Sequence, residues 1–348
     1  MLNEDKLGND PSWADHPRDL FLMVNYFRKY MKRPIIGVGH SMGGNNLVNL
    51  SLMHPRLFTT LILIDPVIQR YASIDGNNAP AKASVGRRDI WASRREAEKK
   101  LKGSKFYQAW DARVLQKWVE HGLRDLPTRL HPKQPSPPPP PALSADPSSG
   151  LAQPLRDGVL VTLTTTKHQE VLTFLRANFP TPEYPNPGQR SNPITHPDAN
   201  LDSPPVTPFY SAVPIATFKR LPHLRPSVLY VFGSESFLST PVMKADKMAH
   251  TGTGAGGSGG VKAGRVAEVT FKGIGHLIPM EVVGQTADAC ADWLSPEMLR
   301  WRRLEDAERE EWENVSREEK AKFSREYETV MKSDWMDEVQ EAAKKAKL

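Results

Sequence analysis

The hydrophobic residues of this chain gather in short unbroken runs. One run occupies residues 35–39, directly after Pro34, and a second, rich in β-branched residues, occupies residues 59–65. Later runs occupy residues 227–233 and 266–271. Apolar runs of this length without polar alternation are typical of strands that are covered on both faces. The pattern therefore predicts four buried strands.

Segments with helical periodicity separate these runs. Residues 15–30 place Leu20, Val24 and Phe27 on one helical face, and residues 45–54 form a helix that stops before a proline. A closing helix is predicted at residues 281–293. Buried strands that alternate with helices form a parallel sheet with helices on both faces. The predicted fold class is therefore α/β.

Proline and charge divide the chain into four parts. Residues 1–83 and 209–295 contain the predicted strands and form the core. Between them, residues 84–208 are predicted as an inserted, mostly helical lid. The lid is interrupted at residues 131–154 by a proline-rich stretch that lacks the apolar content needed to pack. Residues 296–348 are expected to form a charged helical tail.

Composition excludes several classes of function. The net charge is +6, but no basic cluster is interleaved with aromatic residues, so no nucleic-acid partner is expected. No apolar run approaches the roughly 20 residues that cross a bilayer. Cys290 is the single cysteine, which rules out an internal disulfide and fits a reducing compartment. The G-x-G-x-x-G at residues 252–257 follows a helical stretch rather than a strand, so it predicts no dinucleotide cofactor.

The sequence Gly39-His40-Ser41-Met42-Gly43 lies directly between a predicted strand and a predicted helix. In this context G-x-S-x-G is the signature of a nucleophile elbow. A serine in such a sharp turn needs small neighbours, which Gly39 and Gly43 provide. We expect Ser41 to be a nucleophile and the backbone N–H of Met42 to donate one hydrogen bond to an oxyanion.

A serine hydroxyl needs a base, and His276 is the best placed of the ten histidines. It lies on a loop between the last predicted strand and the closing helix. The carboxyl ends of parallel strands share one sheet edge, so this loop should lie beside Ser41. We therefore expect His276 to be the base, with no need for a metal or an organic cofactor.

Three motifs carry a resemblance to a known family. They are GHSMGG at residues 39–44, LIDP at residues 63–66 and GHLIPME at residues 275–281. The stretches 34–67 and 227–293 that contain them resemble the α/β-hydrolase superfamily. They are similar to fungal peroxisomal hydrolases, a group that includes toxin-biosynthesis hydrolases and a peroxisomal lipase. The resemblance implies an α/β-hydrolase fold with a serine, a histidine and an acid.

Two residues are candidates for the acid. In the family an Asp usually follows the penultimate strand by three or four residues, but this chain has Ser236 and Phe237 there, with Glu235 one step earlier. The fold can also place the acid after the strand that follows the nucleophile helix, where this chain has Asp65. Asp65 and Glu235 therefore both remain open.

The resemblance also implies strands that this chain does not show. An α/β-hydrolase has several strands before the nucleophile strand, and a loop among them donates the second oxyanion N–H. Here only about 34 residues precede that strand. We expect a sheet without its N-terminal strands, either because the chain is truncated or because it is a catalytically impaired remnant.

These observations predict a serine hydrolase that acts on an ester or thioester of a small acyl substrate through an acyl-enzyme. The alternative is a remnant or binding protein of the same fold. The chain ends in Ala346-Lys347-Leu348, a variant of the peroxisomal address S-K-L. We therefore expect a peroxisomal location, with the import receptor as a partner; the alternative is the cytoplasm.

Overall fold

The computed structural model describes residues 8, 11–71, 74–132, 158–185, 192, 194–199, 201 and 206–345. The chain divides into two units, residues 1–293 and residues 294–348. Nearly all of the proline-rich stretch predicted at residues 131–154, and the C-terminal tripeptide at residues 346–348, lie outside the described residues.

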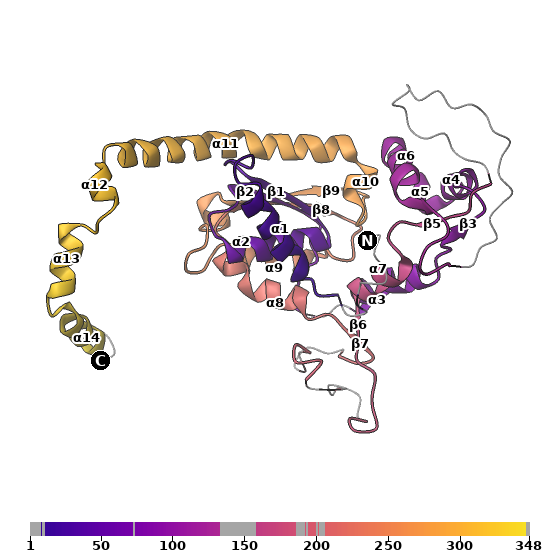
Figure 1. The fold of residues 1–348 in the computed structure, drawn as a ribbon, viewed down its shortest axis with the longest axis horizontal. Helices are drawn as coiled ribbons and strands as arrows, with labels where there is room; N and C mark the ends of the chain where they lie inside the picture. Colours follow the sequence, from indigo (N-terminus) through magenta and orange to yellow (C-terminus); the bar gives the residue numbers. More distant parts are fainter. Residues whose placement is uncertain are drawn as a thin grey trace. The chain divides into compact units, whose positions relative to one another are not determined.

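A four-stranded parallel sheet forms the centre of the first unit (Figure 1). Its strands lie in the order β1-β2-β8-β9, where β1 is Ile36–His40, β2 is Thr60–Ile64, β8 is Ser227–Gly233 and β9 is Val266–Phe271. Every residue of β2 and β8 is buried, as expected of central strands. The four predicted strands are confirmed, β8 and β9 with the predicted bounds.

The strand β1 lies at one edge of the described sheet. It pairs with β2 in parallel register, from Ile36 opposite Thr60 to His40 opposite Ile64. Within the described part of the chain no strand pairs with its other side. The side chain of Val38 is consequently 55% exposed. An α/β sheet with its nucleophile strand at the edge is what the sequence led us to expect.

Helices cover both faces of this sheet (Figure 1). On one face lie α2 (Met42–Met53), α8 (Val213–Arg220) and α9 (Pro241–His250). On the other face α11 begins at Val283, and the indole N–H of its Trp293 donates to Thr60 Oγ1 over 2.9 Å. The central strands β2 and β8 are therefore shielded from water on both sides, which explains their continuous apolar runs, whereas the edge strands β1 and β9 are partly exposed.

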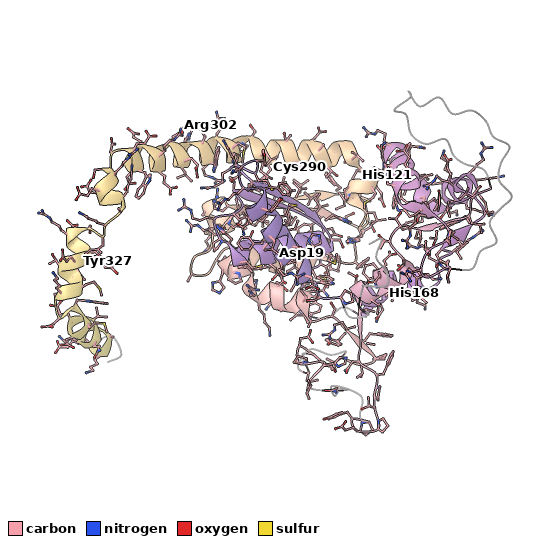
Figure 2. The ribbon with its side chains drawn as sticks, in the orientation of Figure 1. Asp19, His121, His168, Cys290, Arg302 and Tyr327 are labelled. Carbon is pink, nitrogen blue, oxygen red and sulfur yellow. The ribbon has the colours of Figure 1, made fainter. Side chains whose placement is uncertain are left out.

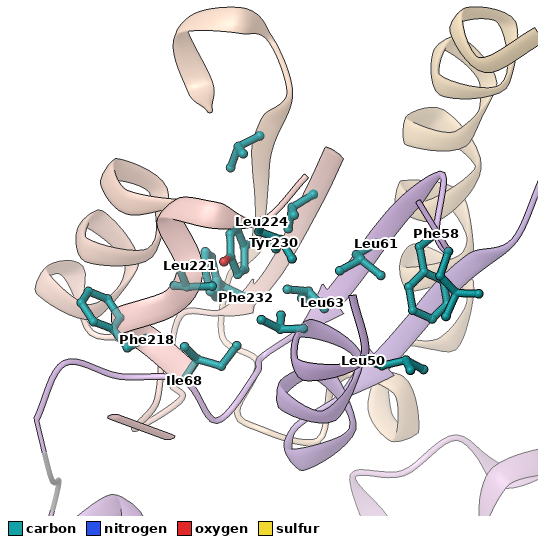
Figure 3. Packing of buried hydrophobic residues seen from close by; sticks show 14 residues of the cluster. Leu50, Phe58, Leu61, Leu63, Ile68, Phe218, Leu221, Leu224, Tyr230 and Phe232 are labelled. Atoms are coloured by element: carbon teal, nitrogen blue, oxygen red, sulfur yellow. The ribbon is translucent and has the colours of Figure 1, made fainter. Parts of the chain in front are cut away.

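The hydrophobic core lies between the sheet and the helices α2 and α8 (Figure 3). The rings of Tyr230 and Phe232 stack there with their centroids 5.4 Å apart. The helix α1 (Asp15–Tyr26) packs Leu20, Phe21 and Val24 against the core, so its predicted apolar face is confirmed for Leu20 and Val24 but not for Phe27, which follows the helix and is exposed. The remaining core side chains include Leu50, Phe58, Leu61, Leu63, Ile68, Phe218, Leu221 and Leu224.

The lid contains a small sheet that the sequence pattern did not predict. Three antiparallel strands pair in the order β3-β5-β4 and bury Trp91, Leu123, Val161 and Leu163 in a core of their own. Strands of two or three residues are too short to show a period of two, which is why only helices were expected. The helix α3 (Ile74–Val85) lies almost entirely before the predicted lid. The elements within the predicted lid are β3 (Ile90–Trp91), α4 (Arg94–Lys102), α5 (Lys105–Gln108), α6 (Ala112–His121), β4 (Leu123–Asp125), β5 (Val161–Leu163) and α7 (Lys167–Phe174).

Two further short strands, β6 (Arg176–Ala177) and β7 (Phe209–Tyr210), pair in antiparallel register. Two single turns precede the last strands of the sheet, η2 (Leu221–His223) before β8 and η3 (Val261–Ala263) before β9. The glycine-rich stretch between α9 and η3 consists of turns and bends, so it does not have the strand–turn–helix order of a dinucleotide site.

The predicted end of the closing helix is wrong. After a short α10 (Ile278–Glu281), the helix α11 runs from Val283 to Glu313 and passes through Pro296 without ending. A proline removes one backbone donor, and the Leu, Arg, Ala and Glu residues that follow are strong helix formers, so the helix resumes. Figure 2 labels Cys290 on its first half and Arg302 on its second.

The second unit otherwise consists of the short helices α12 (Arg317–Lys320), α13 (Arg325–Lys332) and α14 (Trp335–Lys345). Ser316 and Glu319 form a reciprocal capping box at the start of α12, and Ser324 caps α13. A charged helical tail was predicted here. Among the described helices of either unit, none is long and apolar enough to cross a bilayer.

Candidate active site

Four residues with polar side chains lie at the carboxyl edge of the sheet. Ser41 follows β1, Asp65 follows β2, Ser236 follows β8, and His276 lies on the loop after β9. The backbone hydrogen bonds of the sheet continue to the first residues after β1 and β2. Ser41 N–H donates to Ile64 O over 2.9 Å, and Asp65 N–H donates to Val231 O over 2.8 Å. The parallel sheet therefore brings together residues that are up to 235 positions apart.

The backbone at Ser41 has a conformation that residues other than glycine rarely adopt. Its φ is +56° and its ψ is −121°, and the helix α2 starts at the next residue. A Cβ at Gly39 would lie 2.7 Å from the backbone of Gly43, and a Cβ at Gly44 would lie 2.9 Å from the Pro66 side chain. At Gly43 a Cβ would meet nothing within 4 Å among the described residues. The steric need for glycine thus falls on Gly39 and Gly44 rather than on Gly43.

A chain of hydrogen bonds joins serine, histidine and aspartate. Ser41 Oγ lies 2.9 Å from His276 Nε2, and His276 Nδ1 lies 2.6 Å from Asp65 Oδ2. The Asp65 side chain is fully buried, with an exposed fraction of 0%. A carboxylate accepts hydrogen bonds only, so Nδ1 carries a proton and Nε2 of the neutral ring accepts from the serine hydroxyl.

The structure does not bring Glu235, the other candidate acid, to the histidine. The Glu235 side chain is exposed, and its carboxylate accepts a hydrogen bond from Ser234 Oγ over 3.1 Å. Its backbone N–H donates to Ile274 O over 2.9 Å. Glu235 therefore anchors the histidine loop through its backbone, whereas the carboxylate beside His276 belongs to Asp65.

Two serines that the sequence reasoning did not select donate hydrogen bonds to the Asp65 carboxylate. Ser236 Oγ donates to Asp65 Oδ2, and Ser239 Oγ donates to Asp65 Oδ1. Both serines are buried. Ser236 occupies the position at which the family usually has its Asp. A hydroxyl residue in place of the missing carboxylate was the sequence feature that could have identified it.

None of the known family models matches the chain. Over 310 residues the chain is 40% identical to the type I acyl-CoA thioesterase mpaH of Penicillium roqueforti, an alignment that covers 88% of this chain and 68% of that protein. It is also 28% identical over 272 residues to the abhydrolase domain-containing protein ACTT2-1 of Alternaria alternata, which covers 78% of this chain and 87% of that protein.

The chain belongs to the α/β-hydrolase family.

Solved structures agree with this assignment at the level of the fold. The peroxisomal α/β-hydrolase Lpx1 of Saccharomyces cerevisiae superposes on the chain with a TM-score of 0.50 at 15% identity, covering 99% of this chain and 72% of that one. E-2-(acetamidomethylene)succinate hydrolase superposes with the same TM-score and identity. The solved structures thus show the α/β-hydrolase fold, and the 40% identity to an acyl-CoA thioesterase makes the chain an enzyme of the hydrolase class.

His40 supports the histidine loop of this α/β-hydrolase. Burial, together with the neighbouring His276, lowers the pKa of His40 to about 4, so the ring is neutral at physiological pH. A carbonyl oxygen can only accept, so His40 Nε2–H donates to His276 O over 2.8 Å. The two rings lie 4.7 Å apart, and this contact holds the backbone of His276 in place.

A buried lysine contacts the loop of the hydrolase that carries Ser236 and Ser239. The Lys247 side chain is only 1% exposed, and its ammonium group donates to Leu238 O over 3.1 Å and to Met243 O over 3.5 Å. Burial lowers the pKa of Lys247 to about 8, and the charge of Asp65 partly opposes this shift. Lys247 therefore anchors the loop that supplies Ser236 and Ser239 to the acid.

Ser41 lines a cavity of about 670 Å³ between core and lid. This volume lies in the range of small-molecule sites. Among the described residues no group of His, Cys, Asp and Glu side chains has the arrangement of a metal site. The cavity walls include Met42, Val67, Phe237, Leu238 and Leu277 from the core, Ala79, Pro80 and Ala83 from α3, and Phe106, Tyr107 and Phe174 from the lid.

Proposed function

We propose that this α/β-hydrolase cleaves an acyl thioester or ester of a small molecule through an acyl-enzyme on Ser41. The observation that carries the proposal is the hydrogen-bonded chain from Ser41 through His276 to the buried Asp65, with its serine end in the cavity. A serine nucleophile, a histidine base and an orienting acid in this geometry are the requirements of acyl transfer.

Each residue then has a defined role. His276 Nε2 takes the proton of Ser41 as the hydroxyl attacks the acyl carbonyl, and Asp65 stabilises the imidazolium that forms. The N–H of Met42, at the start of α2, donates to the oxyanion. His276 returns the proton to the departing thiolate or alkoxide, and it then activates water to release the acid from Ser41.

A thioester is the first substrate class to test. The chain is 40% identical to proteins named type I acyl-CoA thioesterase in two Penicillium species. The apolar walls of the cavity fit an acyl group, and a thioester hydrolysed through an acyl-enzyme needs no metal or organic cofactor. The peroxisomal import predicted from Ala346-Lys347-Leu348, with the import receptor as a partner, also stays a proposal that rests on that tripeptide.

One observation favours a second candidate, a binding protein of the same fold with impaired catalysis. In the described sheet β1 is an edge strand, and the second oxyanion donor of the family comes from a loop that precedes the nucleophile strand. Loss of one such donor typically costs about 10²–10³ in rate. A protein of this kind would bind an acyl group in the cavity and turn it over slowly.

A fluorophosphonate probe separates the two candidates. The wild-type chain should become labelled and hydrolyse acyl thioesters, and Ser41→Ala should abolish both. Labelling that persists in Ser41→Ala would exclude Ser41 as the nucleophile. A wild-type chain that binds acyl thioesters in a calorimeter but neither labels nor turns them over would support the binding protein.

A further inference from the structure

The cavity that Ser41 lines has a smaller neighbour. A second cavity of about 140 Å³ adjoins it across a wall made by Trp13, Phe174 and Ser211, since these three residues line both spaces. Among the described residues that line the smaller cavity there is neither Ser41 nor His276. The shared residues therefore separate the space next to the nucleophile from a space beyond it.

Trp13 contributes the largest side chain to this wall, and hydrogen bonds hold it in place. It lies in the turn before α1, and its indole N–H donates to Thr173 O on α7 over 2.7 Å. A second hydrogen bond joins the same two parts of the chain, from Gln169 Nε2 on α7 to Gly8 O over 3.3 Å. An indole that is bonded at its polar edge presents a large apolar surface in a fixed orientation. The ring of Trp13 thus has a defined position between the two cavities.

Both spaces can hold hydrocarbon. The larger cavity has the apolar walls described above, and the charges of the smaller one are neutralised within it, because Arg176 Nη1 lies 2.7 Å from Asp198 Oδ1. A saturated acyl chain is the part of a thioester that gains most from such walls, at about fourfold in binding for each buried methylene group. The apolar residues that line only the smaller cavity are Pro11, Leu172, Ala212 and Val213.

We propose that Trp13 is a specificity-determining residue that limits the length of the acyl chain accepted by this site. The end of the acyl chain meets the indole of Trp13, and a longer chain would need the smaller cavity, which the indole closes off. The inference rests on the proposed function, because it concerns the acyl group that Ser41 receives. The substrates are then thioesters whose acyl chain ends within the larger cavity.

The test is the dependence of hydrolysis on acyl-chain length. Saturated N-acetylcysteamine thioesters from butanoyl to hexadecanoyl keep the leaving group constant, and kcat/KM is measured for each below its critical micelle concentration. In the wild type kcat/KM should rise by about fourfold per methylene group up to one length. It should then fall by about tenfold or more for the next methylene group, the usual cost of one methylene too many in a filled pocket.

Trp13→Ala joins the two cavities. The best substrate should become longer by about two carbons or more, and at that length kcat/KM should exceed the wild-type value by about tenfold. A variant whose lid was merely loosened would lose kcat/KM at every length and keep the same best length. Phe174→Ala opens the same wall from the lid side and should shift the best length in the same direction.

Two controls locate the effect. Ala212→Phe added to Trp13→Ala refills the smaller cavity, so the best length should return to that of the wild type. Trp312→Ala makes the same chemical change as Trp13→Ala on α11 in the second unit, where the side chain is 57% exposed, and it should leave the length dependence unchanged.

Fluorophosphonate labelling of each variant shows that the nucleophile elbow is intact, and if either Trp13→Ala or Phe174→Ala does not label, the other decides. An unchanged best length in the labelled variants overturns the role of Trp13 and leaves the proposed function standing. The same holds if the double variant keeps the longer best length, or if the wild type shows no maximum within the series. A wild type that neither labels nor hydrolyses any thioester overturns the proposed function and the role of Trp13 together.

Discussion

Replacing Asp65 by Asn removes one negative charge from the buried end of the Ser41–His276–Asp65 chain. The amide can keep most of the present contacts. Its oxygen can take the place of Oδ2, which accepts from His276 and Ser236, and its NH2 group can take the place of Oδ1, where the Ser239 hydroxyl can turn to accept. The main loss is therefore the charge that stabilises an imidazolium on His276.

The size of this loss follows from the geometry. His276 Nδ1 and Asp65 Oδ2 are 2.6 Å apart, which places the two charge centres roughly 4 Å apart, and at an effective dielectric constant of about 20 their attraction is about 4 kcal/mol. That energy corresponds to a loss of about 10³ in kcat. If the amide turns and selects the wrong tautomer of His276, the loss approaches the roughly 10⁴ known for a serine-protease aspartate.

The assay is thioester or p-nitrophenyl ester turnover, together with the rate of fluorophosphonate labelling. Asp65→Asn should slow both, since both need Ser41 to lose its proton to His276. Glu235→Gln is the matched control, because it makes the same chemical change on the neighbouring exposed carboxylate, and it should change kcat by less than about twofold. Thermal unfolding of the two variants shows that each is folded.

Two results would refute this reasoning. If Asp65→Asn keeps kcat within about tenfold of the wild type, the charge of Asp65 does not stabilise the imidazolium. If Glu235→Gln loses as much as we expect for Asp65→Asn, the acid is Glu235, and the hydrogen bond to Asp65 serves only to hold His276 in place.

Three further predictions follow from the same geometry. Gly44→Ala should destabilise the protein by about 1–3 kcal/mol through overpacking, whereas Gly43→Ala should change the unfolding free energy by about 0.5 kcal/mol or less; equal effects in urea unfolding would contradict the close contacts. Because the pKa of Lys247 is lowered from 10.5 to about 8, the unfolded chain binds this proton more tightly, and the wild type should gain about 3 kcal/mol relative to Lys247→Met as the pH rises across that interval; parallel pH curves would count against it. A fluorescent protein fused to the N-terminus of a chain ending at Leu348 should enter peroxisomes and return to the cytosol when the last three residues are removed, and a diffuse signal from the intact fusion would exclude the import signal.

Local patterns were enough to predict the sheet and the elbow. A buried strand in a parallel sheet is an unbroken apolar run, so all four strands could be placed from the sequence. The small lid sheet could not be predicted, since Ile90–Trp91 and Leu123–Asp125 are too short to show a period. The local sequence also did not predict that α11 continues through Pro296, because a proline is normally a signal for a helix end.

The sequence by itself determined which residue types are available for chemistry, and the motifs around Ser41 and His276 indicated where they lie. It left two carboxylates open, because Asp65 and Glu235 both follow strands that end at the same sheet edge. Only the tertiary structure shows which of the two carboxylates lies beside His276. The ladder from β2 to β8 directs Asp65 inward, where His276 and two serine hydroxyls bind its carboxylate, while the backbone turn after β8 leaves the Glu235 side chain in solvent. These contacts join residues up to 211 positions apart in the sequence, so a local sequence pattern cannot predict that their side chains meet.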